Sequence, residues 1–507
     1  MIAARATTPG PRLGELLAGL AAVSPAADRS IAGVALDSRE AVAGGLFLAC
    51  RGTQRHGLEF LDAALAQGVA AVAWEPAEGL APWAPEGVAL VAVPNLGRHV
   101  SEIAGRFYGE PSHALDVIGV TGTNGKSSTV LMTAEALTAL ATPAGVIGTL
   151  GTGRPGHLTA SGLTTPDAVA VQRLLARMRD DGAGAVAMEA SSHGLDQGRV
   201  EAVHFRVAVF TNLTRDHLDY HGSERAYAEA KARLFTWPSL GAAVLNLDDP
   251  LGRELFDRLD SKVAAIGYTL TGQRAPHGRT LAAEVATSAN GVELNIDGDW
   301  GRARVASPLI GRFNAANLLA VLGALLALDK PFDAAVASLA SVHAAPGRME
   351  RFGGPDDVKP RPLVIVDYAH TPDALDKVLA AAREHAAGRV LAVFGCGGDR
   401  DRGKRPLMAE IAACYADISI VTDDNPRTEN PAAIVTEILA GFPADATVQV
   451  EHDRRRAIAA ALAEARPGDA VVIAGKGHET YQIVGTERRP FDDREVVRAL
   501  LTEEGEQ

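Results

Sequence analysis

Short apolar runs alternate with helical stretches through the middle of the chain. One such stretch, residues 127–139, follows directly on a glycine-rich turn. This alternation is typical of βαβ units, in which helices cover a buried parallel sheet. The runs that predict buried strands are residues 115–120, 185–188, 207–210 and 243–246.

The segment 280–306 has a different pattern. Its turn pairs Asn290-Gly291 and Asp297-Gly298 lie between alternating segments and predict an antiparallel hairpin on the flank of the sheet. A helix over residues 315–327 is expected to close this unit. After Ala345-Pro-Gly347 a second α/β pattern begins, with expected strands at residues 363–366, 390–394, 418–421 and 470–474.

These patterns divide the chain into three expected domains. At roughly 150 residues per domain, a length of 507 residues fits this number. The turn-rich segment 108–112 indicates the first boundary. We expect an α/β fold throughout, with an N-terminal domain over residues 1–110, a central parallel-sheet domain over 111–343, and a C-terminal Rossmann-like domain over 344–507.

The charge balance excludes some classes of partner. The chain has 49 Lys and Arg against 62 Asp and Glu, a net charge of −13. Polynucleotides and anionic membranes need a basic surface, so we expect neither as a partner. Small anionic substrates need only a local basic cluster.

The cysteines and the hydropathy suggest a cytoplasmic protein. Cys50, Cys396 and Cys414 are far apart and odd in number, which fits neither a disulfide framework nor a CxxC metal site. The N-terminus lacks a compact apolar signal region, and no run of about 18 apolar residues predicts a membrane helix. We expect a monomer.

The segment from Gly119 to Ser128, GVTGTNGKSS, predicts a phosphate-binding loop. A strand precedes it and a helix follows, so backbone N–H groups and the helix N-terminus converge on an anion. The loop departs from the strict GxxxxGK[ST] pattern, because Val120 stands at the first glycine. The residues expected to hold ATP are Gly122, Thr123, Asn124, Gly125, Lys126, Ser127 and Ser128, with Lys126 on the β- and γ-phosphates and Ser127 on Mg²⁺.

The spelling TGTNGKS of this loop resembles that of the Mur ligase family. The resemblance extends over nearly the whole chain, and its motifs occur in one order. Besides the loop they are Leu36-Asp-Ser-Arg39, Thr164-Thr-Pro-Asp167, Glu189-Ala-Ser-Ser-His-Gly-Leu195, Asn212-Leu-Thr-Arg-Asp-His-Leu-Asp219, Ala230-Lys-Ala-Arg-Leu-Phe235, Gly311-Arg-Phe-Asn-Ala-Ala-Asn317, Pro346-Gly-Arg-Met-Glu350, Val366-Asp-Tyr-Ala-His-Thr-Pro-Asp373, Gly395-Cys-Gly-Gly-Asp-Arg400 and Asp424-Asn-Pro-Arg427.

The resemblance implies an ATP-driven carboxylate–amine ligase of peptidoglycan synthesis. In this family ATP phosphorylates a carboxylate, here the side-chain carboxylate of D-Glu in a UDP-muramoyl dipeptide. The acyl phosphate is then attacked by an amine, here that of meso-2,6-diaminopimelate. Phosphoryl transfer between anions needs positioning and charge neutralisation, which predicts Lys, Arg and two Mg²⁺ ions.

Four residues are expected to carry the chemistry: Lys126, Glu189, His217 and Lys231. Glu189 follows an apolar strand, where a carboxylate facing the loop suits a first Mg²⁺ together with Ser127. His217 matches a ligand of the second Mg²⁺. Lys231 lies in a helical stretch, where lysine is ordinarily solvated. The resemblance alone marks it as an N6-carboxylysine, a CO₂-derived carbamate that binds the second metal.

The resemblance also assigns the rest of the ATP site and the UDP-substrate site. Asn314 and Asn317 share a helix face and would contact adenine; Arg348 and Asp367 would meet ribose and phosphates, with His370 a further candidate. Leu36 and Ser38 match uridine positions, near the loop 52–56. The positions that match diphosphate and dipeptide contacts are Thr164, Thr165, Ser191, Gln197 and Arg199.

The amine site is expected after the third-domain strands. Arg400 and Arg427 would hold carboxylates, since a guanidinium pairs with them bidentately. Asp424 and Glu479 would hold the ammonium, and Gly475 permits close backbone approach. With Asn425 and Pro426, these residues complete the diaminopimelate site implied by the motif Asp-Asn-Pro-Arg.

Three alternatives stay open. The same ligase could use L-lysine, which lacks the distal carboxylate. A folylpolyglutamate-type ligase shares the phosphate loop and the C-terminal domain. A P-loop hydrolase or regulator would turn over ATP without the organic substrates.

Overall fold

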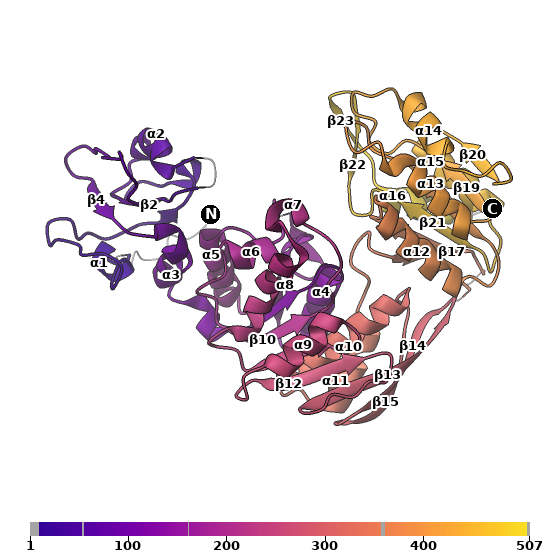
Figure 1. Ribbon diagram of the computed structural model, residues 1–507, viewed down its shortest axis with the longest axis horizontal. Coiled ribbons are helices and arrows are strands. Elements are labelled where there is room, and N and C mark those ends of the chain that lie inside the picture. Colours follow the sequence, from indigo (N-terminus) through magenta and orange to yellow (C-terminus); the bar gives the residue numbers. More distant parts are fainter. Residues whose placement is uncertain (1–9, 53–54, 161, 356–359, 504–507) are drawn as a thin grey trace. The chain divides into compact units, whose positions relative to one another are not determined.

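The apolar runs form the strands of two sheets in the first part of the chain. The computed structural model describes residues 10–52, 55–160, 162–355 and 360–503. The chain divides after Ile266 into a first and a second unit, whose elements are labelled in Figure 1. The loop expected near the uridine site includes Thr53 and Gln54, which lie outside the described residues.

A four-stranded parallel sheet opens the first unit, in the order β1-β2-β3-β4. Leu46 and Leu48 of β2 point into one apolar cluster and Phe47 into another, because alternate residues of a strand face opposite sides. Both faces are therefore buried. The elements are α1 (Leu13–Leu16), β1 (Val34–Ala35), η1 (Ser38–Glu40), β2 (Leu46–Ala49), η2 (Gly57–Phe60), α2 (Leu61–Ala66), β3 (Ala71–Trp74), β4 (Ala89–Ala92), α3 (Leu96–Phe107) and η3 (Pro111–Ala114).

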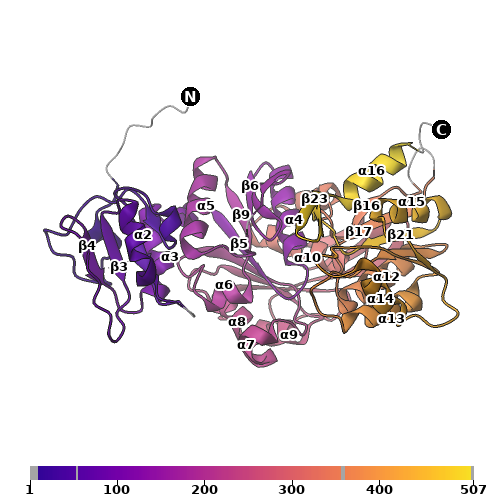
Figure 2. The same cartoon turned by 90° about the horizontal axis from the view of Figure 1, so that it is seen from above.

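The second sheet of this unit contains the predicted central strands. Its strands β11, β10, β5, β9 and β6 are adjacent in that order and parallel, which confirms the expected fold class. Helix α4 packs against β6 and β9 (Figure 2). The bounds are β5 (Asp116–Thr121), α4 (Lys126–Ala139), β6 (Ala144–Gly148), β7 (Gly151–Arg154), β8 (His157–Thr159), α5 (Ala168–Asp180), β9 (Ala185–Glu189), α6 (Ser192–Asp196), β10 (Phe205–Phe210), α7 (Leu218–His221), α8 (Glu224–Ala232), η4 (Arg233–Thr236), β11 (Ala242–Asn246), α9 (Pro250–Arg258) and β12 (Ala264–Thr269).

Strands β10, β5 and β9 are direct neighbours and run the same way, so their carboxyl ends meet at one edge of the sheet. The loops that follow them begin at Thr211, Gly122 and Ala190. Ligands of open α/β sheets bind at such an edge. The fold thus brings the phosphate loop and two of the predicted site segments together.

The second unit begins with the predicted antiparallel hairpin. Ser288 pairs with Gly291, and Gly298 pairs with Gly301, so both predicted turn pairs lie at or beside the turns that join the strands. The predicted helix begins three residues early, at Arg312. The elements are β13 (Arg279–Ser288), β14 (Gly291–Gly298), β15 (Gly301–Ser307), α10 (Arg312–Ala327), α11 (Phe332–Ser338) and η5 (Leu339–Ser341).

The rest of the second unit contains the two-stranded antiparallel sheet β22-β23 and a six-stranded sheet in the order β16-β17-β21-β18-β19-β20. Separate apolar clusters cover its two faces, as expected for a doubly wound domain. Only β16 among its described strands is antiparallel to its neighbour. The bounds are β16 (Glu350–Phe352), β17 (Leu363–Asp367), α12 (Pro372–His385), β18 (Val390–Phe394), α13 (Lys404–Tyr415), β19 (Ile418–Val421), α14 (Pro431–Leu439), β20 (Val448–Val450), α15 (Arg454–Glu464), β21 (Ala470–Ala474), β22 (Tyr481–Val484), β23 (Glu487–Pro490) and α16 (Asp493–Glu503).

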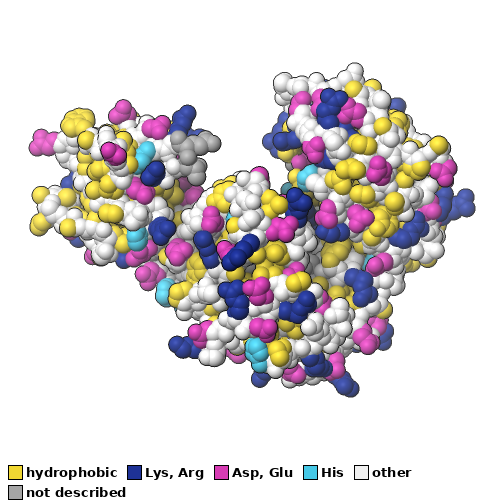
Figure 3. Space-filling view, viewed as in Figure 1, with side chains coloured by type: hydrophobic (Ala, Val, Ile, Leu, Met, Phe, Trp, Pro, Cys, Tyr) yellow, Lys and Arg dark blue, Asp and Glu magenta, His cyan; other side chains and the backbone are white. Residues whose placement is uncertain are grey.

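Surface charges of both signs are interspersed on the face shown in Figure 3. Within the part of the chain that the structure describes, no helix is long and apolar enough to cross a membrane.

Candidate active site

The phosphate loop requires glycine at two positions. Gly122 has φ +147°, and a Cβ there would lie 1.9 Å from the Thr211 hydroxyl. Gly125, at φ +84°, precedes α4. The loop is fixed to the segment that follows β10, because Thr123 N donates to Asn212 O at 2.7 Å. A side chain at Gly122 would therefore force the loop away from β10.

Lys126 lies folded over this loop. Its Nζ donates to the carbonyls of Gly122 and Thr123 at 3.0 and 2.9 Å. A triphosphate offers stronger, charge-assisted acceptors than these carbonyls. The Lys126 ammonium therefore already lies at the loop where the triphosphate is expected to bind. Ser128 lies in the first turn of the helix that follows the loop.

Ser127 and Glu189, which are expected to hold a first Mg²⁺, are joined by a hydrogen bond. Glu189 ends β9 and is 1% exposed, and the Ser127 hydroxyl donates to its carboxylate at 2.8 Å. Thr149 supports the same carboxylate through its N–H at 2.8 Å. Hydroxyl and carboxylate oxygens are ligands that Mg²⁺ prefers, so this donor set fits the ion. Across the described ranges, no group of three or more His, Cys, Asp or Glu is arranged to hold a metal.

Lys231 is buried, contrary to what its helical stretch suggested. It is 1% exposed, and its Nζ donates to Gly122 O at 2.7 Å. Burial and the nearby Lys126 lower its pKa from 10.5 to about 6. The amine is therefore largely neutral at pH 7 and can act as a nucleophile.

His217 lies at the start of α7 with φ +51°, and its side chain is 47% exposed. Its ring is 4.9 Å from the ring of His193 and 5.9 Å from that of Tyr227. Burial, His217 and His221 lower the pKa of His193. His193 and His221 were not predicted from the sequence, although both stand within or beside the motifs that contain Glu189 and His217.

The predicted dipeptide residues form one hydrogen-bonded group beside Glu189. The Thr165 hydroxyl donates to Glu189 O at 2.7 Å and lies 2.9 Å from the Ser191 hydroxyl. Arg199 donates to Thr165 O at 2.6 Å and to Gln197. Thr164, which precedes Thr165 in the chain, accepts from the hydroxyl of Thr149 at 2.9 Å, and Thr149 also donates to Glu189.

A cavity of about 590 Å³ contains the predicted uridine residues. Leu36 is half-buried and Ser38 is 7% exposed. Glu40, which follows this motif in η1, pairs with Arg173 of α5 at 3.1 Å. The lining residues are Leu36, Asp37, Ser38, Arg39, Glu40, Phe60, Asp167 and Val169.

The predicted adenine residues lie in the second unit, both buried on α10. Asn314 donates to Ile310 O at 2.9 Å, and Asn317 donates to the Asn314 side chain at 3.1 Å. As the i, i+3 spacing predicted, they share a face. These contacts orient the Asn314 amide.

Asp367 and Arg348 are neighbours in the second unit. The Asp367 carboxylate accepts from Met349 N and Ala369 N at 2.7 and 2.8 Å. Burial raises the pKa of Asp367, against the effect of Arg348. The Arg348 guanidinium lies 4.8 Å from the centre of the Tyr368 ring, and the neighbouring His370 bonds to Tyr368 O.

The predicted amine-binding residues surround a buried lysine that the sequence reasoning missed. Lys476 is fully buried, and its Nζ donates to Glu479 at 3.2 Å and to Asn425 at 3.3 Å. Asp424 lies 3.7 Å away, and its Oδ1 has no hydrogen-bond partner. A Cβ on Gly475 would stand 3.2 Å from Asp424. The position of Lys476 between two glycines after a buried strand could have marked it.

Arg427 stands on the loop after β19 with φ +52°, following Pro426. Its Nη1 donates to Gly398 O at 2.8 Å, which links this loop to the one carrying Arg400. Arg400 itself is exposed. The second unit thus brings the seven predicted amine-site residues onto adjoining loops.

Three sequence models of known families match the chain in succession. They are the Mur ligase family catalytic domain over residues 30–108, the Mur ligase middle domain over 120–325, and the Mur ligase glutamate ligase domain over 347–477. A relative from Ectopseudomonas mendocina is 54% identical over 459 residues, which cover 90% of this chain and 92% of the relative. The chain belongs to the Mur ligase family.

Two similar relatives bear the same name. The protein of Ectopseudomonas mendocina and that of Pseudomonas aeruginosa, 52% identical over 94% of this chain and 96% of its own, are called UDP-N-acetylmuramoyl-L-alanyl-D-glutamate–2,6-diaminopimelate ligase. A solved structure of a ligase of that name is 37% identical, with a TM-score of 0.75 over 98% of this chain and 99% of the other.

A folylpolyglutamate synthase from Mycobacterium tuberculosis, solved with ADP and AMPPCP, shares the fold alone. It is 22% identical, with a TM-score of 0.57 over 75% of this chain and 92% of its own.

Proposed function

We propose that this chain is an ATP-dependent ligase that joins meso-2,6-diaminopimelate to the side-chain carboxylate of D-Glu in UDP-N-acetylmuramoyl-L-alanyl-D-glutamate, a step of peptidoglycan synthesis. The observation that carries the proposal is the hydrogen bond from Ser127, at the end of the phosphate loop, to the buried carboxylate of Glu189. A carboxylate there supports metal-assisted phosphoryl transfer. The names of relatives 52–54% identical supply the substrates.

The loop from Gly122 to Ser128 holds the triphosphate, and Lys126 neutralises its terminal phosphates. Ser127 and Glu189 would hold one Mg²⁺, and His217 would help hold a second. Magnesium lowers the repulsion between the two anions that react. Asn314 and Asn317 of the second unit contact adenine. Arg348 and Asp367 of the same unit contact the ribose and phosphates.

Lys231 becomes an N6-carboxylysine. Its low pKa keeps the amine neutral, so its nitrogen can form a bond to the carbon of CO₂ and release a proton. The product is an anion where a cation would otherwise stand, beside the phosphate loop. Such an anion would help hold the second Mg²⁺.

The reaction proceeds in two steps. A carboxylate oxygen of D-Glu attacks the γ-phosphorus, and the bond to the β-phosphate oxygen breaks to release ADP. The neutral amine then attacks the acyl carbon, the carbon–oxygen bond to phosphate breaks, and the nitrogen loses a proton. Inorganic phosphate leaves, and an amide remains.

The two organic substrates occupy separate sites. The cavity beside Leu36 and Ser38 takes uridine, and the diphosphate and dipeptide contact Thr164, Thr165, Ser191, Gln197 and Arg199. In the second unit Arg400 and Arg427 bind carboxylate, while Asp424 and Glu479 bind the distal ammonium, with Asn425, Pro426 and Gly475 shaping the pocket. The Oδ1 of Asp424 supports this assignment. It is buried and accepts no hydrogen bond, although the Lys476 ammonium lies 3.7 Å away, and a donor of the substrate would satisfy it.

All partners proposed are small molecules. The free state of Cys50, Cys396 and Cys414 supports a location in the cytoplasm. The monomer expected from the sequence stays a prediction.

The proposal is tested by phosphate release from ATP with the UDP-dipeptide and either diaminopimelate or L-lysine. We expect release only when all three substrates are present, with a mass increase of the UDP-dipeptide that matches diaminopimelate less one water. Preference for L-lysine would establish the alternative ligase. Turnover of ATP without either organic substrate would contradict a ligase.

A further inference from the structure

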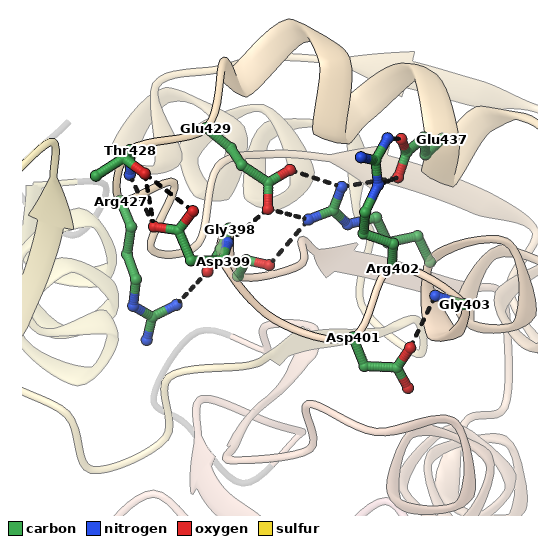
Figure 4. Close-up of polar contacts among 11 residues, drawn as sticks. Gly398, Asp399, Asp401, Arg402, Gly403, Arg427, Thr428, Glu429 and Glu437 are labelled. Atoms are coloured by element: carbon green, nitrogen blue, oxygen red, sulfur yellow. Dashed lines mark hydrogen bonds and ion pairs between the residues drawn. The ribbon is translucent and has the colours of Figure 1, made fainter.

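Two loops of the second unit are joined edge to edge. One follows β18 and includes Gly398 and Asp399; the other follows β19 and includes Arg427 and Thr428. Figure 4 shows the contacts between them: Arg427 Nη1 donates to Gly398 O at 2.8 Å, and the Thr428 hydroxyl donates to the Asp399 carboxylate at 2.9 Å. Gly398 N also donates to Asn425 O at 2.9 Å.

Arg405 lies beneath both loops. It stands in the first turn of α13 and is fully buried. Its Nη1 donates to Glu429 at 3.0 Å and to Glu437 at 2.7 Å. Its Nη2 donates to Glu429 at 2.9 Å and to Gly397 O at 3.3 Å. One side chain therefore bridges the β18 loop, the end of the β19 loop and α14.

Arg402, Arg405, Glu429 and Glu437 form a charged cluster, in which Arg405 pairs with both carboxylates. Hydrogen bonding to Arg405 lowers the pKa of Glu429, and bonding to Arg402 and then to Arg405 lowers that of Glu437. Arg402 is largely exposed, so the buried member of the cluster is Arg405. A lysine offers one compact charge and cannot reproduce the planar fork that holds two carboxylates and a carbonyl.

The contacts continue from Arg405 to Arg427. Glu429 also accepts from Asp399 N, and Asp399 in turn accepts from Thr428. Asp399 and Arg427 have φ values of +54° and +52°, and such backbone conformations persist only when their surroundings hold them. The direction of the Arg427 guanidinium is thus set by the spacing of the two loops.

We propose that Arg405 is a positioning residue for diaminopimelate, which fixes the two loops so that Arg427 and Arg400 face the substrate carboxylate. This inference rests on the proposed function. The carboxylate is the group that L-lysine lacks at its distal end. Loosening the loops should therefore weaken binding of diaminopimelate while ATP, held by other elements, is unaffected.

The test compares Arg405→Lys and Thr428→Val with the wild-type enzyme. Thr428→Val keeps the shape of the side chain and removes one hydroxyl between the loops. The matched control is Thr436→Val on α14, whose exposed hydroxyl bonds within its own helix. KM and kcat are measured for diaminopimelate, ATP and the UDP-dipeptide, and folding is checked by thermal unfolding.

We expect KM for diaminopimelate to rise about tenfold or more in Arg405→Lys and by a smaller factor in Thr428→Val, with KM for ATP within about twofold. Thr436→Val should match the wild type. Equal changes in all three KM values, or an unchanged KM for diaminopimelate in folded Arg405→Lys, would overturn the inference. If Arg405→Lys does not fold, KM for diaminopimelate is compared between Thr428→Val and Thr436→Val, and equal values overturn the inference.

The wild-type control separates the two proposals. Wild-type enzyme that releases no phosphate with diaminopimelate contradicts the proposed function itself. Wild-type enzyme that uses diaminopimelate, while both variants keep its KM, contradicts only the role of Arg405.

Discussion

Lys231 shows how the surroundings of a single side chain change its protonation. Its amine is buried beside a second lysine, so the charged form is disfavoured. A neutral amine is what reaction with CO₂ requires. Lys126 of the phosphate loop and Lys231 both donate to the carbonyl of Gly122.

Replacing Lys231 by Met should abolish ligase activity yet stabilise the protein in CO₂-free buffer. Its pKa is about 6 when folded against 10.5 ordinarily, so the unfolded chain binds more protons between these values. The stability of the wild type therefore rises with pH through this window. We expect the gain in Tm of Lys231→Met to be larger at pH 7 than at pH 9.5.

Thermal unfolding at both pH values measures this gain. The control is Lys262→Met, at an exposed lysine of the same unit. A gain in Tm from Lys231→Met that does not change with pH would show that the lysine is charged when folded.

Removing the Arg427 guanidinium should weaken binding of the amine substrate in particular. Charge-assisted hydrogen bonds contribute about 1.5–3 kcal/mol, so we expect Arg427→Ala to raise KM for diaminopimelate roughly 10- to 100-fold. Steady-state kinetics with Arg456→Ala, an exposed arginine of α15, provide the comparison. Equal increases in KM for diaminopimelate and ATP would defeat the assignment.

At this scale the sequence predicted residue positions better than their environments. Glu189 could be placed because it follows an apolar strand, and the ends of parallel strands meet. The burial of Lys231 and Lys476 could not be predicted, because it depends on packing between segments distant in the sequence. The residues next to Lys231 in the sequence do not indicate that its amine donates to the carbonyl of Gly122, which is distant in the chain.

At the scale of elements, apolar runs predicted strands well. A strand that is buried on both faces is a continuous apolar run, which can be recognised from the local sequence alone. The run at 115–120 became β5 (Asp116–Thr121), shifted by one residue. The short strands β7, β8, β22 and β23 were not predicted. They are mostly polar or partly exposed, and long-range pairing rather than local hydrophobicity forms them.

His385 links elements of the second unit. Gly311 N, at the start of α10, donates to His385 Nε2 at 2.9 Å, so Nδ1 carries the proton and donates to Ser288 O. Burial lowers the pKa of His385 below its ordinary 6.5. Protonation would remove the acceptor for Gly311 N, beside the predicted adenine residues.

This link should be sensitive to acid. Because the folded pKa is depressed, the stability contributed by His385 is present above pH 6.5 and lost as the pH falls through the folded value. Gln can accept and donate at the same places without titrating. We expect His385→Gln to reduce the fall in Tm between pH 7.5 and pH 5.5.

The exposed His113 provides the matched control, as His113→Gln. A pH dependence of Tm that is the same in His385→Gln, His113→Gln and the wild type would refute a role for His385 in acid sensitivity.

At the scale of the whole molecule, the residues assigned roles under the proposed function lie in both units. The phosphate loop, Glu189 and Lys231 belong to the first unit, and Asn314 and the amine-site loops belong to the second. A single sequence identifies both sets through its motifs. The N-terminal sheet with its cavity of about 590 Å³ is the feature that a folylpolyglutamate-type ligase does not need.

The central claim is that ATP phosphorylates the side-chain carboxylate of D-Glu. It is tested most directly by labelling both oxygens of that carboxylate with ¹⁸O and analysing the phosphate released during complete turnover with diaminopimelate. The account predicts one ¹⁸O atom in each phosphate released, because the acyl carbon–oxygen bond is the one that breaks. Phosphate without ¹⁸O would contradict it.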